Sequence, residues 1–314
     1  MNRLPLAFRK DRSHGSPFSL VTRRQADVLF AWFLLLPALL VLVLVMFGPI
    51  VNAVKLSFQD YTLRTRNDPA WNNFENYIDL YESGEIQLYF ENTLIFVTAV
   101  VVLQFVLAMV IALLIGNDLP TRNAFRSLFL MPWTIPSVVT ALVWLLLFQP
   151  EYGLVNHILD VLGVMDRNTQ WVQNPKLAMP AVIIVSVWRQ LPIVLVMLVA
   201  GLQTIPVELV EAARIDGANA IRVFRHIKLP FLAPIIYTSL LLAIIRNFQM
   251  FTLIYNLTAG GPLKRTMTLA LATHMEAFRR FDMGKGAAIG VIWLIVLILI
   301  TLVFNWLNSR SEIE

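Results

Sequence analysis

The chain has 314 residues, of which 58% are hydrophobic and 14% are charged, and its mean hydropathy is +0.68. Residues 28–54 contain no ionisable side chain, and a membrane span needs only about 20 apolar residues. These values exclude an ordinary soluble domain and predict a multi-pass membrane protein. The absence of cysteine excludes disulfides, thiol catalysis and cysteine-ligated metals.

Six apolar segments predict an all-α fold with six transmembrane helices. They cover residues 28–54, 93–116, 127–148, 177–203, 229–257 and 286–307. Residues 28–307 then form one transmembrane domain, preceded by a tail at 1–27 and followed by a short tail at 308–314. The segments outside the membrane are too small to hold a soluble catalytic domain.

Basic residues predict the orientation of these spans. The tail 1–27 carries six, whereas the first loop carries three, and residues 60–91 hold seven acids. The positive-inside rule therefore places both tails in the cytoplasm. The net charge of +5 gives no sign of nucleic-acid binding, because so much of the basic charge lies in this tail. The loop 264–285 opposes the prediction, since it would lie outside with five basic residues: Lys264, Arg265, Arg279, Arg280 and Lys285.

Catalytic chemistry is missing from the predicted spans. An intramembrane serine protease needs a serine and a histidine at membrane depth. Serines occur in the spans, but the four histidines (His14, His157, His226 and His274) fall in tails or loops, which also argues against a histidine metal site. No Gly-Lys-Ser/Thr phosphate loop is present. The sequence therefore predicts no enzyme and no bound cofactor or metal.

Two arginines lie within predicted spans, Arg189 in the fourth and Arg246 in the fifth. A guanidinium at membrane depth costs at least ~2.5 kcal/mol on insertion scales, so each should face the bundle interior or a wet cavity. Two interpretations remain open: contact with a solute, or a structural role in which the arginines bond to carbonyls of neighbouring helices or lock a closed state. The candidate substrate pathway comprises Trp133, Trp188, Arg189, Gln190, Arg246, Asn247 and Gln249, in which aromatic faces and planar donors suit a sugar.

The loop 206–230, between the fourth and fifth spans, combines helix signals with small and charged residues. Pro206 and Glu208 suit a helix start, and Gly217 suits a left-handed stop and reversal of the chain. Ile221, Phe224 and Ile227 follow at helical spacing and are expected to rest on the bundle. Pattern alone allows an interfacial helix lying flat on the membrane. The Glu-Ala-Ala run at 211–213 instead favours close approach of another protein.

This loop resembles the EAA loop of the membrane subunits of binding-protein-dependent ABC importers. The match comprises Glu211, Ala212, Ala213, Gly217, Ile227, Leu229 and Pro230, and Asp216 lies within it. A wider resemblance to maltose-transporter-type permeases covers practically the whole chain, through stretches such as FRSLFLMPWTIPSVVTALVW at Phe125 and FQMFTLIYNLTAGGP at Phe248. The order of segments resembles the first permease of a heterodimeric pair. Arg246 departs from it, since a small or apolar residue is expected there.

The resemblance implies the type I importer fold and a division of labour. The expected partners are a second homologous permease, two cytoplasmic ATPase subunits that bind ATP and magnesium, and a periplasmic or lipid-anchored solute-binding protein. In such an assembly Glu211 pairs with a basic residue of the ATPase, and the chain lies in a bacterial inner membrane. The basic loop 264–285 would then be explained by docking of the binding protein.

The solute stays open between a neutral sugar and an anionic one, such as a sulfonated sugar or a glycerol phosphate, which the two arginines would suit. A secondary carrier or channel is a remote alternative. It would need ion-coupling carboxylates in the spans, and the predicted span cores contain none.

Overall fold

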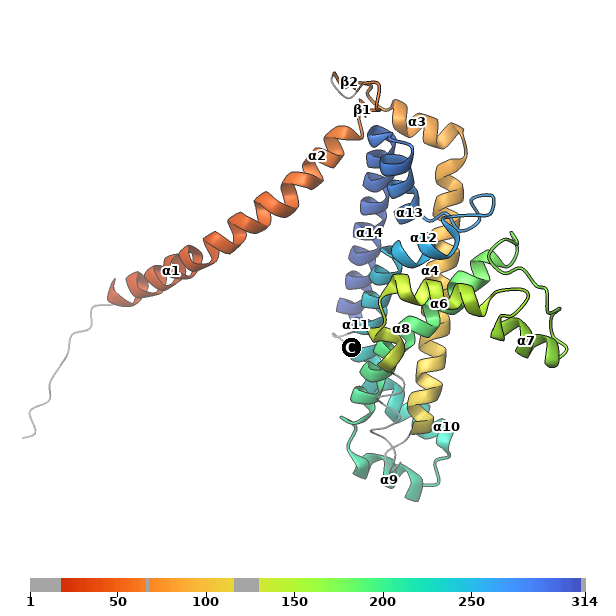
Figure 1. Cartoon of the computed structure of the whole chain (residues 1–314). Helices are drawn as coiled ribbons and strands as arrows, with labels where there is room; N and C mark the ends of the chain where they lie inside the picture. The colour runs from red at the N-terminus through yellow and green to blue at the C-terminus, as the bar shows by residue number, and fades with distance from the viewer. Residues whose placement is uncertain (1–17, 66–67, 116–129, 312–314) are drawn as a thin grey trace, which may run out of the picture. The chain divides into compact units, whose positions relative to one another are not determined.

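The computed structural model describes residues 18–65, 68–115 and 130–311, and the chain divides into two compact units, Met1–Asn52 and Ala53–Glu314. The described elements are helices apart from one two-stranded sheet (Figure 1). Among these residues, five helices are long and apolar enough to cross a membrane, and Ser137–Leu147 forms a shorter apolar helix. The all-α membrane fold is therefore confirmed. The beginning of the third expected span falls in 116–129, outside the described residues.

The first unit is dominated by an apolar helix. Helix α1 (Phe18–Leu42), a π-helical turn (Val43–Phe47) and α2 (Gly48–Leu56) follow one another without a break. Every residue from Phe30 to Asn52 is exposed within this chain. A helix that is apolar on all sides is stable only against lipid or another protein. Helix α1 begins ten residues before the expected span, so part of the expected tail 1–27 is helical; residues 1–17 lie outside the described part.

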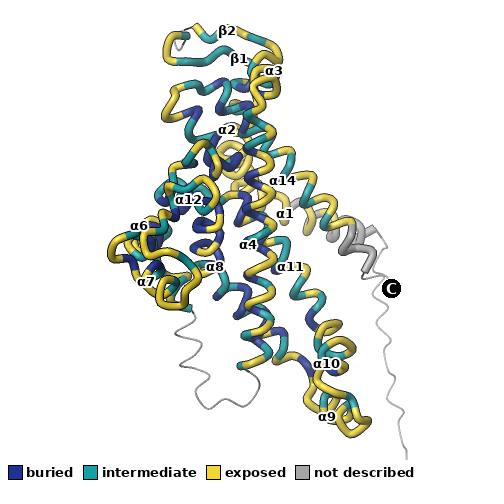
Figure 2. The backbone as a smooth tube through the Cα atoms, turned by 90° about the vertical axis from the view of Figure 1, so that its right-hand side faces the viewer, coloured by how far each residue is buried: buried dark blue, intermediate teal, exposed yellow. Residues whose placement is uncertain are grey.

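The second unit is built on four long helices: α4 (Glu85–Ile115), α8 (Ala178–Leu202), α11 (Leu229–Phe248) and α14 (Met283–Ser311). Helices α4 and α8 pack along each other, and α11 packs against both. Buried positions concentrate on α4 and α8 (Figure 2). A Cβ on Gly201 of α8 would lie about 2.5 Å from side-chain atoms of Ile235 and Leu232, so glycine permits the close approach of α8 to α11.

Two expected spans are broken helices. The fifth, expected at 229–257, divides into α11 and α12 (Thr252–Thr258), with a non-helical step between them. In the third, residues 130–134 are helical, Ile135 and Pro136 interrupt the helix, and α6 (Ser137–Leu147) follows. Pro136 causes the second break because it lacks an amide hydrogen and adopts extended torsions. Helix α8, by contrast, runs without interruption past Pro192.

The two ends of the second unit differ in structure. At one end lie β1 (Gln59–Asp60) and β2 (Ala70–Trp71), which pair antiparallel, with α3 (Glu75–Glu82) and α13 (Leu269–His274). The Asn76 amide joins α3 to this end by donating to the Ser57 and Gln59 carbonyls. At the opposite end lie α9 (Val207–Ile215) and α10 (Ala220–Val223). Helix α7 (Leu154–Val161) lies between α6 and α8 in sequence, and its buried Asn156 is hydrogen-bonded to Trp171.

Candidate functional site

The turn between α9 and α10 has a well-defined local cause. Gly217 adopts φ +82°, its N–H donates to the Arg214 carbonyl at 3.0 Å, and the Ala218 N–H donates to the Ala213 carbonyl at 2.9 Å. These two bonds form a Schellman motif, which ends α9 and satisfies its last carbonyls. The Asn219 side chain then accepts a hydrogen bond from the Arg222 N–H and begins α10. The sequence prediction of a helical stop at Gly217 is therefore confirmed.

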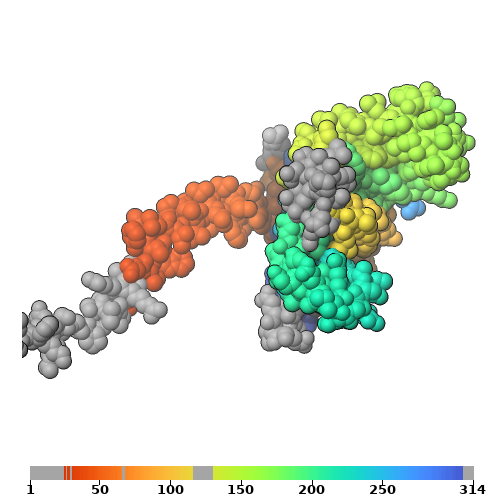
Figure 3. All heavy atoms as spheres, turned by 90° about the horizontal axis from the view of Figure 1, so that it is seen from below, coloured from red at the N-terminus to blue at the C-terminus, as the bar shows by residue number. Residues whose placement is uncertain are grey.

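The side chains of this turn are largely exposed to solvent within this chain. No residue of α9 is buried, and Ile215 and Ile221 are 86% and 75% exposed. Figure 3 looks onto this end of the unit, where the atoms of α9 and α10 lie at the surface. Among the residues of the EAA match, Ala213 and Ile227 are half-buried and the others are exposed: Glu211, Ala212, Gly217, Leu229 and Pro230, together with Asp216.

One packing prediction for this loop is wrong. Ile221 was expected to rest on the bundle with Phe224 and Ile227, but it points to the surface, and Val223 is buried instead, at 4% exposure. The physical reason is the π-helical turn at Phe224–Lys228, which changes the helical phase between α10 and α11. As a result Ile221 belongs to the exposed apolar surface of the turn.

A small, partly open cavity lies in the second unit, between α4, α8 and α11. Its volume is about 50 Å³, and its polar lining consists of Gln104, Gln190, Ser239 and Arg246. The Gln190 amide donates to the Asn247 side-chain oxygen at 2.8 Å, and both side chains are buried. The structure thus brings together three residues of the predicted pathway, Gln190, Arg246 and Asn247, from two helices.

Several buried polar atoms on the helices that line this cavity have no partner. Gln104 is 1% exposed, and both polar atoms of its side chain are buried without a hydrogen bond. The Nε of Arg189 is also buried without one. Such groups cost free energy unless a ligand, water or another protein satisfies them. The sequence reasoning missed Gln104, although a lone glutamine in the apolar run of α4 was a signal that could have found it.

The other pathway candidates lie away from the cavity lining. Trp188 is 37% exposed and packs edge to face on Trp144, with ring centroids 5.6 Å apart. Gln249 is exposed at the end of α11, beside the break before α12. Trp133, 44% exposed, lies on the segment before α6.

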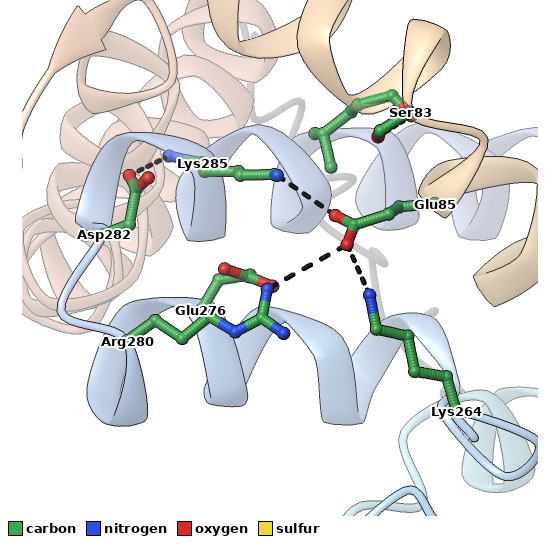
Figure 4. A network of polar contacts seen from close by, with 8 residues as sticks. Ser83, Glu85, Lys264, Glu276, Arg280, Asp282 and Lys285 are labelled. Atoms are coloured by element: carbon green, nitrogen blue, oxygen red, sulfur yellow. Dashed lines mark hydrogen bonds and ion pairs between the residues drawn. The ribbon is translucent and has the colours of Figure 1, made fainter.

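At the opposite end from the turn, a charged network centres on Glu85 (Figure 4). Lys264 donates a hydrogen bond to one carboxylate oxygen of Glu85, and the Nζ of Lys285 lies 3.0 Å from the other. Arg280 pairs with Glu276 at 2.7 Å and lies 4.0 Å from Glu85. The hydrogen bond to Glu85 raises the pKa of Lys264, and burial raises the pKa of the Glu276 carboxyl.

This network explains the basic loop that opposed the predicted orientation. Of the five basic residues, Lys264, Arg280 and Lys285 pair with acids of this chain, and Arg279 donates a hydrogen bond to the Tyr255 hydroxyl. Among the described residues, only the side chain of Arg265 has no partner within the chain. Most of the basic residues of this loop therefore form ion pairs within the chain, which hold the loop to α4 and α14, and are not free to bind a docking protein.

Residues 104–312 match the family described as binding-protein-dependent transport system inner membrane component, which is more than half of the chain. The chain belongs to this family. It is a permease subunit, a transport protein rather than an enzyme, and a multi-pass membrane protein.

Named relatives agree with this assignment. The chain is 32% identical over 274 residues to the trehalose/maltose transport system permease protein MalF of Thermococcus litoralis, covering 87% of this chain and 91% of the relative. It is 32% identical over 278 residues to the sulfoquinovosyl glycerol transport system permease protein SmoG of Agrobacterium fabrum, with 88% and 90% covered.

The fold also matches that of a solved permease. A chain of the bacterial alginate ABC transporter, crystallised in complex with an alginate-bound periplasmic protein, superposes with a TM-score of 0.76 at 20% identity. The match covers 92% of this chain and 96% of that one. The expected type I importer fold and the resemblance to sugar-importer permeases are thereby confirmed.

Proposed function

We propose that this chain forms half of the translocation pathway of an ATP-driven importer for a sugar or sugar derivative. The observation that carries the proposal is the exposed Schellman turn, which presents Glu211 and the two alanines at one end of the bundle. Small residues permit close seating in a groove, and a carboxylate supplies a directional, charge-assisted contact. The turn is the coupling helix, on which an ATPase subunit docks.

The assembly needs partners for the tasks that this chain cannot perform. Two ATPase subunits bind ATP and magnesium and supply the energy, and a second permease subunit completes the pathway. A solute-binding protein delivers the cargo at the end that holds α3 and the Glu85 network. Membrane lipid or the second permease covers the apolar helix of the first unit. With the coupling end in the cytoplasm, both tails also lie there.

The proposed cargo class follows from the relatives. The names of two of them refer to trehalose or maltose and to sulfoquinovosyl glycerol, which are all carbohydrates or their derivatives. Gln190, which lines the cavity and is held there by Asn247, supports this class, because a planar amide binds hydroxyl groups well. These residues, with Arg189 and Arg246, line the pathway in the proposed assembly.

Charge reversal tests the coupling contact. Glu211→Lys should leave insertion and folding intact, because Glu211 is exposed and has no ion pair within the described residues. Solute uptake should fall at least ten-fold in proteoliposomes containing the whole complex, since one charge-assisted contact contributes about 1.5–3 kcal/mol. The measurements are uptake, ATP hydrolysis per solute transported, and copurification of the ATPase.

Glu208→Lys provides the matched control, because Glu208 is also exposed, on the first turn of the same helix. It should reduce uptake much less than Glu211→Lys. Normal uptake by the Glu211 variant, or equal loss in both, would contradict a specific role for Glu211.

A further inference from the structure

We propose that Arg189 and Arg246 select a cargo that carries an acidic group, which binds between α8 and α11 beside Gln104. This inference rests on the proposed function, since it names the chemistry of the solute that the pathway accepts. The acidic group is a carboxylate, sulfonate or phosphate ester on a carbohydrate, because the forked guanidinium of arginine matches these groups with two parallel hydrogen bonds.

The two arginines lie at similar membrane depth. Arg189 is 13 residues before the end of α8 at Leu202, and Arg246 is 17 residues after the start of α11 at Leu229. At 1.5 Å per residue these intervals are about 20 and 25 Å, which places both arginines within the hydrocarbon core of about 30 Å, in the half farther from the coupling turn. The hydrogen bond between Gln190 and Asn247 joins the residues that directly follow the two arginines. That bond fixes the relative level of the two helices at the arginines, and Arg246 lines the cavity directly.

Neither arginine has a counter-ion in the part of the chain that the structure describes. No carboxylate pairs with Arg189 or Arg246 there, neither side chain forms a hydrogen bond, and α8 and α11 contain no acid. Bonding to neighbouring carbonyls, which the sequence left open, is therefore not what holds them in this chain. Two like charges at membrane depth repel each other and are costly unless an anion joins them.

Gln104 gives an independent indication of a ligand. It comes from a third helix, α4, it is 1% exposed, and it lines the same cavity as Arg246 with both of its polar atoms unpaired. A glutamine in that state can donate to an anionic oxygen and accept from a hydroxyl of the same ligand. An apolar residue would fill this position at lower cost if the cavity had no polar occupant.

The size of the cavity indicates which part of the cargo enters it. A volume of about 50 Å³ holds a few water molecules or one compact group, since each water needs roughly 10–15 Å³. A sugar ring does not fit. We therefore place the acidic substituent in the cavity, against Arg246 and Gln104, and the sugar ring outside it.

Matched glycosides test this inference on the assembled complex. The permease pair and its ATPases, purified in lipid nanodiscs, are titrated with methyl glucuronide and methyl galacturonide, and with the neutral methyl glucoside and methyl galactoside. The readout is the midpoint of thermal unfolding at constant ionic strength, which a bound ligand raises. At least one uronate should raise the midpoint, and its neutral counterpart should do so much less.

Variants assign the effect to the two arginines. Arg189→Gln and Arg246→Gln should each weaken uronate binding about ten-fold or more, because a hydrogen bond to a charged group is lost. Arg246→Lys should retain part of the affinity, since it keeps the charge without the fork. Arg265→Gln is the matched control: this exposed arginine lies in the loop before α13 and does not line the cavity, so its loss should leave the response unchanged.

Three results would overturn the inference: no shift with either uronate, equal shifts with each uronate and its neutral counterpart, or an undiminished shift in both glutamine variants. If an acid of the second permease neutralises the arginines instead, the variants will lower the midpoint without ligand and the uronates will give no shift. Glu211→Lys separates the two proposals, because a complex with this change should still bind uronate. Uronate binding without any coupling role of Glu211 would remove only the coupling proposal.

Discussion

Gly217 sets the shape of the coupling turn through its backbone alone. Its φ of +82° lies in the left-handed region, and no heavy atom lies within 4 Å of the place a Cβ would occupy. A side chain there would therefore meet no steric clash with neighbours, only the torsional cost of the conformation. That cost is about 1–2 kcal/mol for a residue other than glycine.

Gly217→Ala should consequently shift the turn toward other conformations and reduce coupled uptake several-fold. ATP hydrolysis should become less dependent on solute, because the seating of α9 and α10 is altered. Gly163→Ala is the control, since Gly163 has φ +67° and equally open surroundings, just after α7. Both variants should lose similar stability in thermal unfolding. Equal effects on coupling would show that strain, rather than the turn's position, is responsible.

At the scale of elements, Glu85 holds three separate segments together. It lies at the start of α4, and its cationic partners come from the loop before α13, from the residue after the π-helical turn Met275–Arg279 and from α14. The Glu85 side chain is only 16% exposed, so its removal leaves partly buried ammonium groups without a counter-ion. Breaking such a buried arrangement is strongly destabilising, whereas fully exposed pairs contribute little.

We expect Glu85→Gln to lower the free energy of unfolding by about 1–3 kcal/mol, between the values for exposed and fully buried ion pairs. Residues 260–285 should also become more sensitive to limited proteolysis. Glu75→Gln is the matched control, because Glu75 is an exposed acid in the first turn of α3 with no ion pair among the described residues. An unchanged unfolding midpoint for Glu85→Gln would mean that the network makes no net contribution to the free energy of unfolding.

At the scale of the whole molecule, the proposed topology puts the Glu85 network and the coupling turn on opposite sides of the membrane. Helix α4 has 31 residues, or about 46 Å at 1.5 Å per residue, which is long enough to cross the hydrocarbon core. The two ends of the second unit can therefore face different compartments, one toward a solute-binding protein and the other toward an ATPase.

The absence of native cysteine makes this topology directly testable. Glu82→Cys, at the α3 end, should react with a membrane-impermeant maleimide in intact spheroplasts. Arg225→Cys, at the coupling end, should react only after the membrane is permeabilised, and both positions are exposed. Labelling is read by a mass shift of the purified chain. The reverse pattern would invert the orientation, and labelling of both in intact spheroplasts would rule out the proposed spans.

Local features of this protein could be read from the sequence because their causes are local. Apolar runs long enough to span a membrane predict helices, and Gly217 and Pro206 mark the ends of α9 through their own torsional preferences. The π-helical turn at Phe224–Lys228 and the break after Phe248 were not predicted. Both depend on the hydrogen-bond register of the backbone, which neither hydropathy nor the spacing of apolar side chains reports.

Contacts between distant segments were decided only by the tertiary structure. The sequence marked Arg189, Gln190, Arg246 and Asn247 as unusual at membrane depth, but it could not show that the two amides bond to each other and leave the arginines unpaired. Only the fold places Gln104 in the same cavity as Gln190 and Arg246. Only the fold pairs Glu85 with Lys264 and Lys285, which lie almost 200 positions later in the chain. Such pairings depend on how helices pack and rotate against one another, which residue type and spacing along one helix do not determine.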